Sequence, residues 1–289
     1  MNKKTLAASA ATTLATILQA GVADSATNIP AEWRQPVKPF HILGNIYYVG
    51  MKGIAAYLIT SGDGAVLLDG TLKENAPVIE KNIETLGFKL KDVKILISSH
   101  AHYDHAGGLA QIKADTGATF IASRADQWGL EHGAQDGDIN YTADPYPPVK
   151  VDRSFETTDT VTLGDIVLKA LVTPGHTKGC TTWSTATMEK GRVLEVVFPC
   201  GVTVAGNVLV GNKSYPQIAK DFSKTFDMLA AMKADVVLTG HPEQSDVWGR
   251  KAKADAGDES AFVDSGMLKR MAEKYRDAFE KELAKTQAD

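Results

Sequence analysis

The sequence is poor in several features that mark large classes of protein. It has two cysteines in 289 residues, and after the N-terminal segment it has no apolar stretch long enough to cross a bilayer. Its 31 lysines and arginines are outnumbered by 35 acidic residues and form no basic run, so a nucleic-acid partner is not expected. Short repeats and low-complexity tracts are also absent. We therefore expect a soluble, monomeric globular protein that binds neither nucleic acid nor membrane.

The first residues have the pattern of an export signal. Two lysines precede a mildly apolar stretch (residues 6–18), and small residues follow it. The pattern predicts a signal peptide over residues 1–23, cleaved after Ala23 or Ala26, and a single mature domain over residues 27–289 in the periplasm. A disordered cytoplasmic tail is the alternative, because threonine and serine dilute the apolar stretch.

Strand-like and helix-like patterns alternate along the rest of the chain, which predicts an α/β domain. Three short β-rich runs separated by glycine-containing turns come first and predict an antiparallel meander. A segment rich in proline and turn formers (residues 140–153) is expected to be an ordered surface loop. The expected strands are residues 45–50, 55–60, 65–70, 93–98, 119–123, 160–164, 166–173, 181–187, 192–198 and 235–240, and the expected helices are residues 75–86, 107–117, 218–232 and 259–285.

Residues 98–108, SSHAHYDHAGG, concentrate three histidines and one aspartate at the end of an expected buried strand. His100 and His102 are separated by one residue, so in an extended segment both rings leave on the same side and can reach one ion. Asp104 and His105 then turn in the other direction. The segment therefore suits two metal sites that share a border, in the crevice at the carboxyl end of a strand where α/β sheets hold ligands.

Two more histidines follow expected strands in the same way, His176 in TPGHTKG and His241 in LTGHPEQ. Pooling them gives two sets of three ligands, and three protein ligands leave a position open for water, as in catalytic zinc sites. A structural zinc site is not expected, because such sites rely on thiolates and no cysteine lies near the cluster. His41 and His132 lack such a setting and are expected to be structural or surface residues. The first set is His100, His102 and His176, and the second set is Asp104, His105 and His241.

The motifs SSHAHYDHAGG, TPGHTKG and TGHP resemble the ligand motifs of the metallo-β-lactamase superfamily. More narrowly, GAVLLDG, YPPVKVDR, AGNVLVGNKSYP and a histidine in place of a cysteine ligand at the second site resemble the third subclass (B3) of class B β-lactamases. The resemblance runs from about Phe40 into the C-terminal helix. It implies a four-layered αβ/βα sandwich, with the metal site at the strand ends between two sheets. It also implies an enzyme that hydrolyses the amide bond of a β-lactam, a small-molecule substrate.

The resemblance further implies roles for individual residues. Two Zn²⁺ ions would be held by the two sets, and a zinc-bound hydroxide would attack the β-lactam carbonyl, because zinc lowers the pKa of bound water to about 7. Asp104 would ligate the second zinc and orient that hydroxide. Family members often have a hydroxyl residue where Gly201 stands, so Thr203 is the expected contact to the substrate. The chain lacks the S-x-x-K, S-D-N and K-T-G set of the serine enzymes.

Two other functions have to be weighed against this one. Lactonases and thioesterases of the superfamily generally carry a bridging aspartate between the second and third ligand motifs, where this chain has Cys200 and Gly201 and no acid. The later Asp221 and Asp227 lie on an expected helix, where carboxylates usually face solvent. A non-catalytic metal-binding module would be expected to lack a ligand, and none is missing. The residues therefore favour the β-lactamase hypothesis.

Cys180 and Cys200 flank an expected hairpin and could be neighbours across it. An exported protein meets an oxidising compartment, but directly paired strands seldom satisfy disulfide geometry. We therefore expect two buried free thiols, with Cys200 as a metal ligand as an alternative. The disulfide that some family members carry has no counterpart here, because Ala234 stands where its first half would fall.

Overall fold

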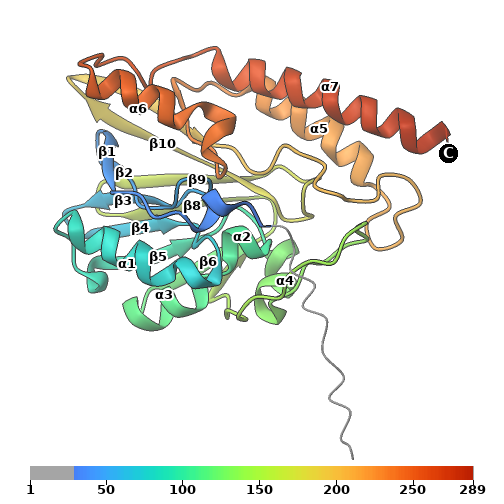
Figure 1. Cartoon of the computed structure of the whole chain (residues 1–289), viewed down its shortest axis with the longest axis horizontal. Coiled ribbons are helices and arrows are strands. Elements are labelled where there is room, and N and C mark those ends of the chain that lie inside the picture. Colours follow the sequence, from blue (N-terminus) through green and yellow to red (C-terminus); the bar gives the residue numbers. More distant parts are fainter. Residues whose placement is uncertain (1–28, 289) are drawn as a thin grey trace, which may run out of the picture.

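Two mixed β-sheets pack face to face, and helices cover their outer faces (Figure 1). This arrangement is seen in a computed structural model that describes residues 29–288. The expected signal peptide, residues 1–23 with cleavage after Ala23 or Ala26, lies outside the described residues.

The first sheet has seven strands in the order of the chain. They are β1 (Phe40–Leu43), β2 (Ile46–Tyr48), β3 (Tyr57–Ser61), β4 (Gly64–Leu68), β5 (Val93–Ile97), β6 (Thr119–Ser123) and β7 (Arg153–Phe155). The first four strands pair antiparallel, which confirms the predicted meander, and β4 to β7 pair parallel. Parallel neighbours send their carboxyl ends to the same edge, so the loops after β4, β5 and β6 lie together.

The second sheet has five strands in the order β12, β11, β10, β9 and β8. They are β8 (Thr158–Leu163), β9 (Ile166–Val172), β10 (Thr181–Glu189), β11 (Arg192–Phe198) and β12 (Val236–Val237). Strands β8 to β11 pair antiparallel, and β12 pairs parallel with β11. The last strand is shorter than the expected residues 235–240, because the Thr239 N–H donates to Ser245 Oγ (3.4 Å) and not to β11.

Helices lie on the outer face of each sheet (Figure 1). The α-helices are α1 (Ala76–Thr85), α2 (Tyr103–Ala106), α3 (Leu109–Thr116), α4 (Gln127–His132), α5 (Ile218–Ala231), α6 (Val247–Asp255) and α7 (Met267–Ala288). Short 3₁₀ helices add η1 (Ala31–Arg34), η2 (Lys73–Asn75), η3 (Leu90–Asp92), η4 (Arg124–Asp126) and η5 (Pro242–Ser245). Within residues 29–288, no helix has the length and apolar character needed to cross a membrane.

Three apolar clusters hold the four layers together. Between the sheets, Tyr57 meets Phe198 at 5.3 Å and Phe155 meets Trp183 at 5.8 Å, measured between ring centroids. A second cluster packs α1 and α3 on the first sheet, and a third packs α5 and α7 on the second sheet. Each sheet therefore buries both of its faces, as a sheet with one helical and one sheet neighbour must. The predicted four-layered αβ/βα sandwich is confirmed.

The C-terminal helix begins later than the sequence pattern indicates. Residues 259–285 were expected to be helical, but α7 starts at Met267, and Phe262 packs in the core between the sheets. The buried Arg250 guanidinium accounts for this, because it donates hydrogen bonds to the carbonyls of Val237 (2.8 Å) and Phe262. A carbonyl that accepts from a side chain is not available for a helical hydrogen bond, and residues 259–262 form turns instead. The apolar residues of the expected helix therefore pack in two different places. Phe262 packs between the sheets, whereas Met271 and Phe279 of α7 pack on the second sheet.

The two cysteines form a disulfide, so the expectation of free thiols is wrong. Cys180 and Cys200 are bonded, with their Cα atoms 5.7 Å apart, and both are buried. The objection from strand geometry does not apply, because the last ladder pair between β10 and β11 joins Trp183 to Phe198. Both cysteines lie beyond that pair, where the strands no longer constrain each other. The bond also removes Cys200 from the possible thiolate ligands of a metal ion.

We predict that the disulfide stabilises the domain by about 3 kcal/mol, because it closes a loop with a sequence separation of 20 residues. The double variant Cys180→Ala/Cys200→Ala should lose about this free energy of unfolding in urea titrations, and added reductant should destabilise only the parent protein. Thiol titration of the denatured, unreduced protein should find no free thiol. Two titratable thiols would contradict the assignment.

Candidate metal centre

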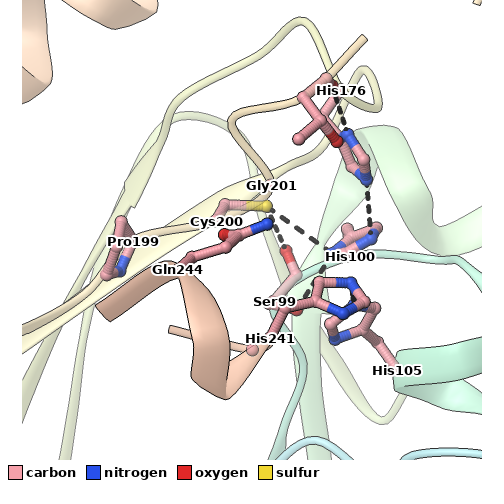
Figure 2. A pocket seen from close by; sticks show the side chains of 11 residues that line it. Ser99, His100, His105, His176, Pro199, Cys200, Gly201, His241 and Gln244 are labelled. Atoms are coloured by element: carbon pink, nitrogen blue, oxygen red, sulfur yellow. Dashed lines mark hydrogen bonds between the residues drawn. The ribbon is translucent and has the colours of Figure 1, made fainter. Parts of the chain in front are cut away.

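The site is built from loops that follow the carboxyl ends of strands in both sheets. Asp69 follows β4 and His100 follows β5, whereas His176 follows β9 and His241 follows β12. Because the sheets face each other, these loops meet at one edge of the sandwich, where the imidazole rings gather (Figure 2).

A local change of backbone separates the ligands of the clustered motif. His102 is extended (φ −96°, ψ 151°) and directly precedes the one-turn helix α2, which carries Asp104 and His105. The extended part therefore directs its side chains to one position and the helical turn directs its side chains to another. This is the divergence that the spacing of the motif predicts.

The first set brings three buried imidazoles together. His100 Nε2 lies 3.1 Å from His176 Nε2, and the ring of His102 lies 4.6 Å from each of the other two, between centroids. One nitrogen from each ring lies within 4.8 Å of the others, which is close enough for one metal ion. All three residues are at most 6% exposed.

The second set adds a carboxylate. Asp104 Oδ2 lies 3.4 Å from both His105 Nε2 and His241 Nε2, and those two nitrogens are 3.3 Å apart. The His100 and His105 rings are 4.2 Å apart between centroids, so the two sets are neighbours. The structure thus brings together the same two sets of three residues that the sequence pattern predicts.

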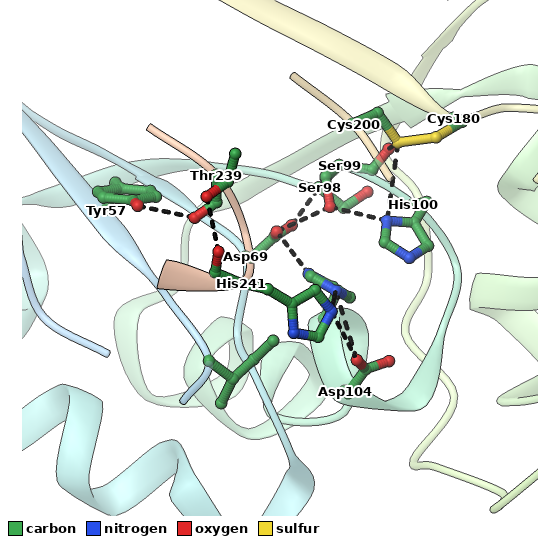
Figure 3. Close-up of polar contacts among 12 residues, drawn as sticks. Tyr57, Asp69, Ser98, Ser99, His100, Asp104, Cys180, Cys200, Thr239 and His241 are labelled. Carbon is green, nitrogen blue, oxygen red and sulfur yellow. Dashed lines mark hydrogen bonds and ion pairs between the residues drawn. A yellow bond between two sulfur atoms is a disulfide. The ribbon is translucent and has the colours of Figure 1, made fainter. Parts of the chain in front are cut away.

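Asp69 orients one ring of each set, His105 directly and His100 through Ser99 (Figure 3). Its Oδ2 accepts from Ser99 Oγ (2.7 Å) and from His105 Nδ1 (3.0 Å). Because the Ser99 hydroxyl proton is used in this bond, Ser99 Oγ accepts from His100 Nδ1 (2.9 Å). In their neutral forms both rings therefore carry the proton on Nδ1 and present the Nε2 lone pair to the centre.

Backbone carbonyls and neighbouring loops fix the two remaining distant histidines. His176 Nδ1 donates to the carbonyl of Thr203 (2.7 Å), which leaves its Nε2 lone pair facing His100. Thr239 Oγ1 donates to the carbonyl of His241 (2.6 Å) and so holds the loop that carries this residue. The ring of His176 and the backbone of His241 are thus held by residues outside the two ligand sets.

The donor set fits metal ions. Two lone pairs on nitrogens 3.1 Å apart repel each other when water is excluded, and a shared cation removes that repulsion. The buried Nε2 of His102 also has no hydrogen-bond partner among the described residues. Neutral imidazoles and one carboxylate, with no thiolate, are ligands that zinc accepts.

Burial sets the protonation of the first set. It lowers the pKa of His100 and His102 well below the usual value and that of His176 to about 4, and the neighbouring imidazoles lower the first two further. Burial alone would raise the pKa of Asp104, but His105 and His241 hold it below the usual range. At neutral pH the first set is therefore uncharged, and Asp104 is ionised.

Two glycines pack directly against ligand rings. A Cβ on Gly201 would lie 2.4 Å from His176 Cδ2, and a Cβ on Gly240 would lie 2.5 Å from His105 Cε1. Side chains cannot enter at either position without moving a ring. A hydroxyl residue at position 201, as the family resemblance would suggest, would therefore need His176 to move.

An open cleft of about 350 Å³ leads to the two sets. Trp33, Tyr103 and Tyr141 line it together with Asp104 and Thr203. The Trp33 ring lies 5.1 Å from the His241 ring, between centroids, and so forms part of the wall next to the second set. The volume suits a drug-sized molecule, and the aromatic walls suit an apolar body.

Sequence reasoning missed three residues that shape the site, Asp69, Asp126 and Trp33. A signal of the kind used for the histidines was available for both aspartates, because Asp69 lies in the last residues of an expected strand (LLDG) and Asp126 comes shortly after another (ASRAD). Trp33 comes from η1, and no local pattern connects it with the ligands. His41 and His132 lie outside the site as expected, both exposed and each within hydrogen-bond distance of a nearby backbone carbonyl.

Comparisons with known proteins agree with this geometry. A family model described as the metallo-beta-lactamase superfamily matches residues 49–241. The chain therefore belongs to the metallo-beta-lactamase superfamily, and the expected family resemblance is confirmed.

Within the superfamily, the chain groups with solved subclass B3 structures. It is 41% identical to BJP-1 of Bradyrhizobium japonicum, with a TM-score of 0.85 over 89% of this chain and 97% of that one. It is 36% identical to native FEZ-1 of Legionella gormanii, with a TM-score of 0.84 over 88% and 98% of the two chains. It is also 31% identical over 108 residues to a hydroxyacylglutathione hydrolase of Maricaulis maris, and this match spans 36% of the chain and only 33% of that protein.

We predict that Asp69→Asn lowers zinc affinity by about 10- to 100-fold. Oδ1 accepts from the Ser99 N–H (2.7 Å) and Oδ2 accepts from Ser99 Oγ and His105 Nδ1, so in either orientation the amide places its NH₂ group against a donor. Asparagine tolerates the left-handed backbone of this position (φ 63°), so the change isolates the loss of the carboxylate. Zinc titration of the apo-protein measures the effect. Asp63→Asn, at an exposed turn, is the matched control, and equal affinities in the two variants would contradict the prediction.

Proposed function

We propose that the protein is a zinc-dependent hydrolase that opens the amide bond of β-lactams. One observation carries the proposal: two intact three-ligand sets lie at the base of an open cleft. The proposal is supported by the similarity of this chain to subclass B3 metallo-β-lactamases. It is 33–41% identical to them over nearly their whole lengths.

In this proposal, His100, His102 and His176 hold one Zn²⁺ ion, and Asp104, His105 and His241 hold a second one. Bound zinc supplies two things, activation of water as a nucleophile at neutral pH and polarisation of the amide carbonyl. The chain's own contribution is a set of rings whose lone pairs are already aimed at the centre by Asp69, Ser99 and the carbonyl of Thr203.

The ionised Asp104 has a second proposed role beside metal binding. Its carboxylate lines the cleft, so it can accept a hydrogen bond from the attacking water and orient it toward the substrate. Trp33 and Tyr141 bound the same cleft and would exclude bulk water from one side of a bound bicyclic substrate. Thr203 is the proposed donor to the substrate carboxylate.

Thioester hydrolysis is the second candidate, because the chain is similar over 101–113 residues to proteins described as hydroxyacylglutathione hydrolases. Lactone hydrolysis, the other function expected from the superfamily, uses the same kind of centre. Both candidates are weakened by the absence of an acid at residues 200 and 201, where Cys200 is in a disulfide and Gly201 packs on His176. Asp227 lies exposed on α5 and pairs with Arg276 (2.6 Å), away from the site.

Export to the periplasm, after removal of residues 1–23 or 1–26, is part of the proposal. The Cys180–Cys200 disulfide supports it, because such bonds persist in oxidising compartments.

We predict that the purified protein hydrolyses a chromogenic cephalosporin, that a chelator abolishes this activity, and that Zn²⁺ restores it. The same preparation should act far more slowly on a lactone panel and on S-D-lactoylglutathione, a thioester. Spectrophotometric rates measure all three reactions. Turnover of thioesters or lactones without β-lactam hydrolysis would overturn the proposed substrate, and full activity after metal removal would overturn the metal dependence.

We predict that Thr203→Val raises KM for β-lactams about tenfold with a smaller change in kcat, because a hydrogen bond to a carboxylate contributes about 1.5 kcal/mol or more. Steady-state kinetics separate the two constants. Thr160→Val, on the exposed strand β8, is the control. An unchanged KM would exclude Thr203 as a substrate contact.

A further inference from the structure

Asp126 is a buried acid that belongs to neither ligand set. It lies in η4, just after β6, and is 5% exposed. Its two oxygens accept three hydrogen bonds: Oδ2 from the Ala101 N–H (3.0 Å) and from Thr177 Oγ1 (2.8 Å), and Oδ1 from the Gly179 N–H (2.8 Å). A buried carboxylate with three donors is held in one position.

The three donors have one feature in common, which is their place beside the first ligand set. Ala101 lies between His100 and His102 in the chain, and Thr177 directly follows His176. The first two histidines come from the loop after β5, and the third comes from the loop after β9 in the opposite sheet. One carboxylate therefore joins the two loops that together supply the first set.

Two other hydrogen bonds join strand β10 of the second sheet to the residues before His100. The Thr181 N–H donates to the Ser99 carbonyl (2.8 Å), and Trp183 Nε1 donates to the Ser98 carbonyl (2.9 Å). Both bonds fix the start of the histidine motif, before His100. Asp126 joins the Ala101 N–H, between His100 and His102, to the loop after β9, and the Ala101 carbonyl accepts from Tyr146 Oη (3.0 Å).

We propose that Asp126 is a positioning residue that sets the distance between the two halves of the first ligand set and so determines the zinc affinity of that site. The inference rests on the proposed zinc ligands. It assigns no direct contact between Asp126 and zinc or substrate.

The packing around Asp126 leaves no substitute for its carboxylate. A Cβ on Gly179 would lie 2.6 Å from Asp126 Cγ and 2.0 Å from Ser123 Oγ, so the loop after β9 closes tightly on the acid. Asparagine has the same shape, but either orientation of its amide places an N–H₂ group against a backbone N–H. Asp126→Asn therefore replaces an attraction with a repulsion at one loop while it preserves volume.

The experiment is a zinc titration of apo-protein in two backgrounds that isolate the sites. In the His241→Ala background, which leaves the first site, Asp126→Asn should weaken zinc binding by at least tenfold. In the His102→Ala background, which leaves the second site, the same change should leave zinc affinity within about twofold. Thr177→Val removes one of the three donors and should give a smaller loss in the same direction, which keeps the test available if Asp126→Asn does not fold.

Asp152→Asn is the matched control. Asp152 also accepts from a backbone N–H, that of Phe120 (2.9 Å), and it pairs with Lys113 (2.7 Å), but it touches neither ligand loop. The control should bind zinc as the parent does at both sites, and thermal unfolding of the apo-proteins compares the stability of the two variants. Equal weakening at both sites, or unchanged affinity at the first site, would overturn the role of Asp126. Failure of the parent protein itself to bind zinc would instead overturn the proposed function.

Discussion

The close approach of buried imidazole nitrogens is the constraint on which the rest of the structure depends. His100 and His176, both buried, face each other through Nε2 atoms 3.1 Å apart. Neutral rings that point lone pairs at each other in a dry site are stable only if a cation lies between them or if strong contacts hold them there. The contacts are present: Asp69, Ser99 and the carbonyl of Thr203 each fix the far side of a ring.

The two-sheet architecture explains how six proposed ligands from three loops come to one place. Parallel strands in the first sheet send Asp69, the histidine motif and Asp126 to one edge, and the second sheet brings His176 and His241 to the same edge from the other side. The sheets are joined directly behind the ligands by Trp183 and Thr181, which donate to Ser98 and Ser99. The ligand loops are therefore supported by both sheets, and the open cleft lies on the solvent side.

The ligand sets could be predicted from sequence because they follow from local rules. The one-residue spacing of His100 and His102 and the position of His176 and His241 after strands contain the needed geometry. Contacts between distant segments were not predictable in the same way. Trp33 reaches the cleft from an N-terminal turn, and Phe262 leaves the expected helix because Arg250, on a different helix, holds its carbonyl. The Cys180–Cys200 bond was missed because strand pairing was assumed to continue past Trp183.

The number and position of the bound metal ions decide whether the two ligand sets form two zinc sites. Crystals of the protein purified with zinc, measured above and below the zinc absorption edge, locate the ions by anomalous scattering. We expect two peaks, one among His100, His102 and His176 and one among Asp104, His105 and His241. Protein that contains zinc but has no peak at either set, or has its peak on other residues, would contradict this expectation.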